Sequence, residues 1–185
     1  MARKTSVDTF ELAASRGAYD EYPIFPPGKD PQLCLSRNDR EQPFFLLCEK
    51  DTLIAQMSGE GRVDFKGTAV NSFPLEPGDF IYVPAGTPHR LVPSSESVNF
   101  RYKPSRPGLE GVAWYCAKCG TELHREIWDT ASTSSQAACF DACRRFSADN
   151  RMRTCGVCRE LHPPIDLSPF NWQAVAAEIE ADRSA

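Results

Sequence analysis

The stretch PGDFIYVPAGTPH, residues 77–89, carries the strongest structural signal in the chain. A short run of β-forming residues, Phe80 to Val83, is followed by Pro84 and Gly86, and the stretch ends at His89. Proline fixes φ and starts a tight turn, and glycine tolerates the positive φ that such a turn often requires. The pattern therefore predicts a strand, a tight turn and a second strand that begins at the histidine.

The spacing from Gly78 to His89 resembles the second sequence motif of the cupin superfamily, in which the histidine points into the mouth of a small barrel. From Leu33 to about Tyr102 the chain alternates short apolar runs with glycine and proline. That alternation is typical of an antiparallel β-sandwich or barrel. We predict an all-β-dominated fold with a cupin (double-stranded β-helix, or jelly-roll) barrel over residues 32–109.

Composition and charge exclude some kinds of partner. The chain has 185 residues and a formal net charge of −4, and its largest basic cluster is the pair Arg144 and Arg145. Nucleic-acid-binding proteins normally carry a basic patch, so nucleic acid is not an expected partner. No window approaches the roughly 18 consecutive apolar residues of a membrane helix, and no apolar run follows the basic residues near the N-terminus. We expect a soluble, cytoplasmic protein.

Four of the eight cysteines form two C-x-x-C pairs. Cys116 and Cys119 lie in WYCAKCG, and Cys155 and Cys158 lie in CGVC. Such pairs place four thiolates at the corners of a tetrahedron, which Zn²⁺ or a single iron ion prefers. Two disulfides or a redox-active pair are weaker interpretations, since the cytosol keeps thiols reduced and no thioredoxin-like pattern surrounds either pair. We predict one structural Zn or Fe in a module over residues 110–164.

The remaining cysteines show no second metal pattern. Cys139 and Cys143 are spaced i, i+4 in a predicted helix, where they are expected to pack as small apolar residues. With Cys34 and Cys48 they complete the set of eight.

A short helix and a connector are predicted before the barrel, in residues 1–31. The helix runs from Thr5, as N-cap, to Gly17, as stop signal, and its apolar face consists of Val7, Phe10 and Ala14. The connector, Tyr22 to Pro31, contains four prolines, which exclude a helix and an interior strand.

Two further sequences, GLEGVAWYCAKCGTELHRE and CGVCRELHPP, resemble the bacterial type of 3-hydroxyanthranilate 3,4-dioxygenase. The resemblance covers roughly Thr9 to Pro164. It implies a cupin enzyme that opens the ring of 3-hydroxyanthranilate with O₂ at an Fe(II) held by two histidines and one glutamate. It also implies a second, rubredoxin-like iron on four cysteines. The four paired cysteines and His89 match the family's pattern.

The other family positions do not match. The family has a histidine seven residues before a Phe-Phe pair and a glutamate immediately before it. With Phe44 as the first residue of that pair, these positions hold Arg37 and Pro43. The positions of the two substrate-gripping arginines hold Leu33 and Pro93, and the position of a glutamate that assists proton transfer holds Arg101.

The missing ligands cannot come from elsewhere in the barrel. The chain has three histidines, and His124 and His162 both belong to the cysteine module. Iron held by His89 and by Asp39 or Glu41 would be weakly and unselectively bound. We therefore expect no barrel metal.

Arg37, His89 and Arg101 are the predicted catalytic cluster. Arg37 would give an incoming carboxylate a bidentate partner, and His89 would titrate near neutral pH and act as acid or base. With Tyr82, the two arginines are predicted to bind a small anionic metabolite. Two simpler interpretations stay open: Arg37 faces solvent if the strand register shifts by one residue, and Tyr82 is a core aromatic residue.

The C-terminal residues 165–185 are predicted to form an amphipathic helix, with Ser168 as N-cap and Pro169 at the first position. Its apolar stripe consists of Trp172, Val175, Ala176 and Ile179. The stripe packs either on the chain's own barrel or across a homodimer, the assembly that the family resemblance implies.

Three functions are compatible with the sequence. The first is an enzyme without a barrel metal that performs acid/base chemistry on an anionic aromatic or amino-acid-derived metabolite, in a biosynthetic cluster. The second is a ring-cleaving dioxygenase with an unrecognised ligand set. The third is a non-catalytic binding or scaffold cupin.

Overall fold

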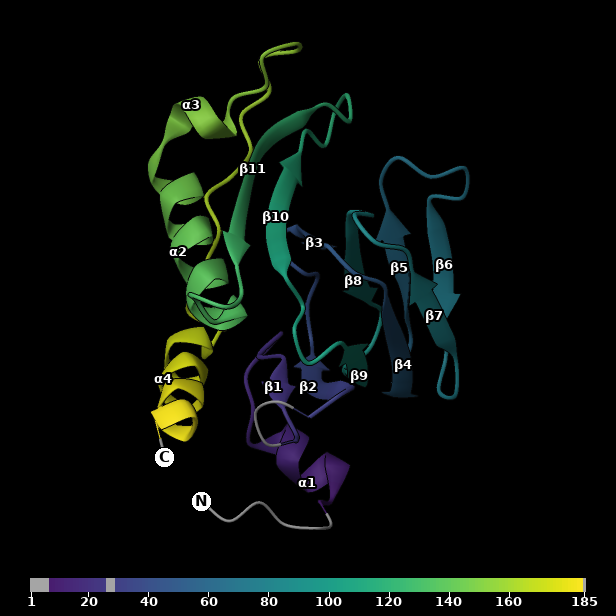
Figure 1. The fold of residues 1–185 in the computed structure, drawn as a ribbon. Helices are drawn as coiled ribbons and strands as arrows, with labels where there is room; N and C mark the ends of the chain where they lie inside the picture. Colours follow the sequence, from purple (N-terminus) through teal and green to yellow (C-terminus); the bar gives the residue numbers. More distant parts are fainter. Residues whose placement is uncertain (1–6, 26–28, 185) are drawn as a thin grey trace.

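The computed structural model describes residues 7–25 and 29–184 and consists mainly of two antiparallel sheets packed on each other (Figure 1). One sheet has five strands in the order β1-β2-β9-β4-β7, and the other has six in the order β11-β10-β3-β8-β5-β6. The predicted all-β, cupin-type fold is confirmed. The strands are β1 (Tyr22–Pro23), β2 (Gln32–Asn38), β3 (Phe45–Cys48), β4 (Thr52–Ser58), β5 (Gly61–Phe65), β6 (Ser72–Leu75), β7 (Phe80–Val83), β8 (His89–Pro93), β9 (Ser97–Lys103), β10 (Leu109–Tyr115) and β11 (Glu122–Asp129).

The turn between β7 and β8 has the predicted form. Gly86 has a φ of 71°, a conformation that L side chains rarely adopt, and its N–H donates to Cys48 O at 2.7 Å. The N–H of Thr87 closes the turn on Pro84 O at 3.1 Å. Because the turn ends at Thr87, β8 begins at His89, whose side chain is fully buried.

The inner face of the five-stranded sheet is unusually polar. Ser36 on β2 is paired with Asn99 on β9, which is paired with Gln56 on β4, and all three side chains are buried. Asn99 Nδ2 donates to Gln56 Oε1 at 2.5 Å. Buried polar groups are stable only when they are hydrogen-bonded, so this polar group is held together beside an apolar core that includes Ile54, Val63 and Leu91.

The cysteine module shares its sheet and its core with the barrel. β10 pairs with β3 on one side and with β11 on the other, and α2 (Ser135–Ala148) packs against both β10 and β11. Trp114 of β10 stacks on Phe146 of α2 with a centroid separation of 4.1 Å. Cys139 and Cys143 are buried in α2, as predicted. A short helix, α3 (Asn150–Arg153), follows.

The leading helix differs from the prediction. It is α1 (Thr9–Ala14), and its N-cap is Asp8, whose carboxylate accepts the N–H groups of Phe10 and Glu11. The predicted N-cap, Thr5, lies outside the described residues. Phe10 is 54% exposed and Ala13 is buried, so the predicted apolar face was wrong. Within its described residues, the connector contributes the two-residue edge strand β1, consistent with its prolines.

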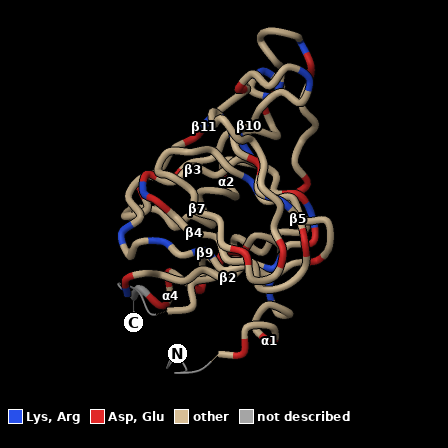
Figure 2. The backbone as a smooth tube through the Cα atoms, turned by 90° about the vertical axis from the view of Figure 1, so that its right-hand side faces the viewer, with Lys and Arg blue, Asp and Glu red and all other residues tan. Residues whose placement is uncertain are grey.

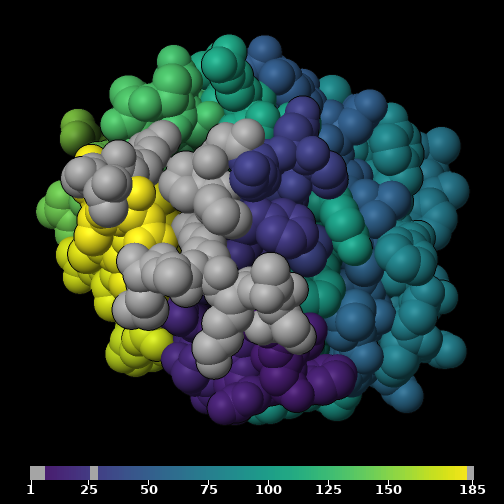
Figure 3. Space-filling view, turned by 60° about the horizontal axis from the view of Figure 1, so that its bottom comes forward, coloured from purple at the N-terminus to yellow at the C-terminus, as the bar shows by residue number. Residues whose placement is uncertain are grey.

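The C-terminal helix α4 (Trp172–Ser184) packs on its own chain. Figure 3 shows α4, in yellow, beside the green segment that contains α2, and the two helices are in contact. Trp172 and Val175 are each 1% exposed, and Trp172 Nε1 donates to Tyr19 O at 2.8 Å. The helix thus packs within its own chain, but against α2 and the segment that contains Tyr19 and not mainly against the barrel strands, as the first predicted arrangement had it. The helix starts at Trp172 and not near Ser168.

Basic and acidic positions are interspersed along the chain. Figure 2 shows lysine and arginine positions interspersed with aspartate and glutamate along the backbone, without an extended basic tract. Within the described residues, no helix has the length and apolar character needed to cross a membrane.

Candidate functional site

His89 lies at the centre of a buried group of charged side chains. Its Nδ1 is 2.9 Å from Thr87 O, and its Nε2 is 2.7 Å from Nη1 of Arg101. A carbonyl oxygen only accepts hydrogen bonds, so Nδ1 carries the proton and Nε2 is left with a lone pair. A guanidinium only donates, so Arg101 donates to that lone pair. The nitrogen that would bind a metal ion is therefore occupied by a cation of the chain.

Three further charged residues complete this group. Glu21 accepts from Arg101 Nε at 2.7 Å with one oxygen and from Lys103 Nζ at 2.7 Å with the other. Lys103 Nζ also lies 3.0 Å from Glu110, whose second oxygen accepts from Ser135 Oγ at 2.5 Å, near the start of α2. We call His89, Arg101, Lys103, Glu21 and Glu110 the barrel cluster.

The charge states in the barrel cluster follow from burial and proximity. Burial opposes ionisation of Glu21, but Arg101 and Lys103 outweigh it and lower the pKa to about 2. Lys103 is also desolvated, yet Glu110 and Glu21 raise its pKa well above the usual value. Burial, and next Arg101, lower the pKa of His89 to about 3. The imidazole is thus neutral at physiological pH, in contrast to the predicted titration near neutrality.

The structure brings together only two of the three predicted catalytic residues. Arg101 and His89 are in contact, but Arg37 projects from the opposite face of its sheet. Its neighbours on β2, Ser36 and Asn38, point inward, and alternate residues of a strand face opposite sides. Arg37 pairs instead with Glu96 at 2.5 Å, and its side chain is 32% exposed. The alternative interpretation from the sequence, in which Arg37 faces away from the barrel interior, is therefore the correct one.

Tyr82 is also outside the barrel. It is 59% exposed on β7, and a hydrogen bond to Asp51 raises the pKa of its phenol. Its neighbour Val83 is 1% exposed, so the inward position on this strand belongs to valine.

Three members of the barrel cluster were missed from the sequence. Arg101 and Lys103 alternate with Phe100 and Tyr102 in the strand VNFRYK, and that period of two was a usable signal that both cations share a face. Glu110 lies in the apolar run LEGVAWY, where an isolated carboxylate was a weaker signal. Glu21 lies before β1 in an irregular segment with a φ of 44° and had no periodic signal.

A cavity of about 570 Å³ opens beside the barrel cluster, between the ends of β2 and β9 and the start of α2. Lys103, Glu21 and Glu110 line it, together with Cys34 and Gln136. Arg101 and His89 are not among its lining residues, and Glu21 connects them to it. We call this cavity the barrel pocket.

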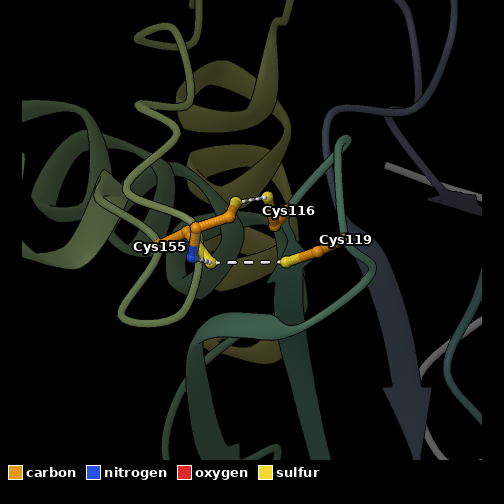
Figure 4. A group of neighbouring side chains, drawn as sticks. Cys116, Cys119 and Cys155 are labelled. Carbon is orange, nitrogen blue, oxygen red and sulfur yellow. Dashed lines mark hydrogen bonds between the residues drawn. The ribbon is translucent and has the colours of Figure 1, made fainter.

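The four paired cysteines form a second group, here called the four-cysteine cluster. Cys116 and Cys119 follow β10, Cys155 and Cys158 follow α3, and their sulfur atoms all lie within 4.8 Å of one another. Figure 4 shows the sulfurs of Cys116, Cys119 and Cys155 turned toward a common centre. A tetrahedral ion with metal–sulfur bonds of about 2.3 Å needs sulfurs about 3.8 Å apart, so the donor set fits Zn²⁺ or iron.

The two cysteine loops have the same backbone design. Gly120 N donates to Cys116 O at 2.8 Å, and Arg159 N donates to Cys155 O at 3.0 Å. The residue after the second cysteine is left-handed in both loops, with φ of 75° at Gly120 and 65° at Arg159. The residue of the second loop that is equivalent to Gly120 is therefore an arginine.

The family comparison matches this architecture. Residues 51–153, more than half of the chain, match the model of the AraC-like ligand binding domain. The chain belongs to that family. It is also similar to 3-hydroxyanthranilate 3,4-dioxygenases. It is 29% identical to the protein of Brucella anthropi over 126 residues (65% of this chain, 68% of the relative) and 28% identical to that of a Jannaschia species over 139 residues (73% and 71%).

Solved structures support the fold. A hydroquinone 1,2-dioxygenase from Sphingomonas sp. TTNP3, in complex with 4-nitrophenol, superposes with a TM-score of 0.50 at 18% identity. The match covers 56% of this chain and 33% of that one. At this identity the likeness concerns the fold alone.

Proposed function

We propose that this chain is a small-molecule-binding relative of the cupin dioxygenases in which the guanidinium of Arg101 stands in for the barrel metal ion. The observation that carries the proposal is the contact of Arg101 with both His89 Nε2 and Glu21, each at 2.7 Å. An imidazole and a carboxylate are ligands that a divalent metal would use. Here they hold a cation that is part of the chain.

The iron of the related dioxygenases does not fit this barrel. His89 is the sole barrel histidine, and the other two have partners in the C-terminal part: His124 contacts Glu126 at 3.3 Å, and His162 contacts Pro163 O at 2.7 Å. A second positive charge beside Arg101 would be repelled at short range. We therefore propose that the protein does not cleave 3-hydroxyanthranilate.

Acid/base catalysis on a bound metabolite is the second candidate. The pocket has charged groups on its floor, which favours it, since Lys103 and Glu110 are both placed to contact a ligand. Against it, the pKa values of Glu21 and His89, about 2 and about 3, are far from neutral, and a proton-transfer group works best near the operating pH. The balance favours binding over turnover.

The four-cysteine cluster completes the proposal as a rubredoxin-like structural site. Cys116, Cys119, Cys155 and Cys158 would hold one Zn²⁺ or one iron ion, which would tie the β10–β11 hairpin to the segment after α3. A cytoplasmic homodimer is part of the same proposal, supported by the family resemblance.

Metal counting and oxygen uptake test this function. Wild-type protein incubated anaerobically with excess Fe(II) and desalted should retain one metal per chain and show no oxygen uptake with 3-hydroxyanthranilate. Arg101→His replaces the cation with a second imidazole near His89 and Glu21, so this variant should retain a second equivalent of Co²⁺ or Fe(II).

Arg37→His is the matched control, because it makes the same change on the outer face of the same sheet and should not add a metal. The added equivalent should disappear when His89→Ala is combined with Arg101→His. A wild-type protein with two metals per chain and oxygen uptake above about 1 per second would overturn the proposal.

A further inference from the structure

The barrel pocket also indicates the charge of its ligand. Resting on the function proposed above, we propose that the pocket selects an uncharged molecule with an apolar body and a hydrogen-bonding head. This differs from the anionic metabolite expected from the sequence, which depended on a free guanidinium at Arg37.

The charges at the floor of the pocket balance one another. Lys103, Glu21 and Glu110 line the floor, and Arg101 lies behind Glu21 without lining the pocket. Together they carry two positive and two negative charges, and each contacts an opposite partner within 3.0 Å. All four side chains except Glu21 are at most 5% exposed, and that of Glu21 is 15% exposed. A charged ligand would leave a like charge close by in a poorly solvated place, which costs free energy.

Hydrogen-bonding capacity remains at the floor. Among the described residues, Lys103 Nζ contacts two carboxylates, and an ammonium has three donors. Gln136 donates both hydrogens of its amide to Asp20 O and Glu21 O, which leaves its oxygen as an acceptor. One donor and one acceptor suit a neutral amide or a hydroxyl group.

The rest of the pocket agrees with this choice. Pro23, Phe25, Pro107 and Ile179 provide apolar wall. The rim carries charges of both signs, among them exposed Lys50 and Arg106 against exposed Glu49 and Asp129. Water and salt screen exposed charges, so the buried floor decides the selectivity.

Three matched probes test the inference: 3-hydroxybenzamide, 3-hydroxybenzoate and 3-hydroxybenzylamine. They share a ring and a hydroxyl group and differ in one neutral, anionic or cationic substituent. Their dissociation constants for the full chain are measured at pH 7 by ligand-observed NMR titration. We expect the amide to bind at least tenfold more tightly than the benzoate and the amine.

Two variants shift the charge balance in opposite directions. Glu110→Gln leaves one excess positive charge and should move the preference toward the benzoate, whereas Lys103→Met leaves one excess negative charge and should move it toward the amine. If either variant fails to fold by circular dichroism, the wild-type ranking still decides. Ala131→Trp, which fills the pocket without touching the floor, should abolish binding, and Ala174→Trp on exposed α4 surface should not.

The outcomes separate the two proposals. Tighter binding of the benzoate or of the amine to wild-type protein, lost in Ala131→Trp, would overturn the neutral-ligand inference and leave the binding function intact. Binding of none of the three would overturn both. Binding that Ala131→Trp leaves unchanged would place the ligand elsewhere and also contradict the inference.

Discussion

The barrel cluster and the four-cysteine cluster differ in where their cation comes from. The barrel cluster combines an imidazole and two carboxylates with Arg101 and Lys103, so its positive charges belong to the chain. The four-cysteine cluster consists of four thiols of the same kind, with sulfur atoms within 4.8 Å of one another. Four thiolates at that distance repel one another unless an ion lies between them. Residues able to bind a metal thus indicate a metal site only where no lysine or arginine of the chain already neutralises them.

The largest expected effect is at the four-cysteine cluster. Cys116→Ser should reduce bound metal from one per chain to near zero and destabilise the C-terminal half. The reason is that metal binding is coupled to folding, with apparent values of about 10–16 kcal/mol in zinc-finger peptides. Elemental analysis and thermal denaturation measure both effects. Cys139→Ala, at a cysteine buried in α2, should keep the metal, and equal metal loss in both variants would contradict the assignment.

The next largest effect is at Arg101. Arg101→Met removes one partner of a buried ion pair and should lower the free energy of unfolding by about 3–5 kcal/mol. Arg37→Met makes the same change at a partly exposed ion pair and should cost no more than about 1 kcal/mol. Urea denaturation of both variants gives the comparison. Similar losses would mean that Arg101 is not the internal cation of the barrel.

A smaller effect should appear in the pH dependence of stability. The pKa of His89 is about 3 in the folded chain against 6.5 for a free imidazole, so the unfolded chain binds more protons between these values. The contribution of the neutral His89 imidazole to the free energy of unfolding is therefore fully present above pH 6.5 and is lost as the pH falls toward 3. Between pH 7 and pH 5 the loss should be about 2 kcal/mol.

His89→Gln should remove that part of the pH dependence, because an amide oxygen can still accept from Arg101 and does not titrate. Unfolding free energies at pH 7 and pH 5 supply the data. An unchanged slope in His89→Gln would show that the imidazole is already charged when folded.

The smallest expected changes in stability come from substitutions at the left-handed residues of the two cysteine loops. Gly120→Ala should lower stability by about 1 kcal/mol, because a β-carbon is unfavourable at positive φ. Arg159→Gly relieves the same strain in the second loop, and the greater freedom of glycine in the unfolded chain offsets part of the gain. We expect a change below about 1 kcal/mol, in the stabilising direction. Thermal unfolding of metal-loaded protein measures whether Gly120→Ala lowers and Arg159→Gly raises the melting temperature.

Much of the fold and the four-cysteine cluster were predictable from local sequence patterns, whereas most of the barrel cluster was not. The β7–β8 turn and the four-cysteine cluster depend on short spacings, which fix backbone geometry wherever they occur. The position of Arg37 depends on which face of β2 points inward, and an ungapped match to a family pattern cannot determine a strand's register. Glu21 could not be predicted for another reason. An irregular segment brings it to Arg101, 80 positions later in the chain, and no sequence periodicity indicates such a contact.

The contact of Arg101 with His89 also affects how the protein depends on its surroundings. A bound metal ion can be stripped by a chelator, replaced by a tighter-binding competitor or oxidised, and each event inactivates the site that holds it. A guanidinium is fixed by covalent bonds, keeps its charge at every physiological pH and has no accessible redox state. On the proposed function, loss of iron would therefore leave the charges of the barrel cluster unchanged. Dependence on a bound metal ion would then be confined to the proposed site in the four-cysteine cluster, at the opposite end of β10 from Glu110.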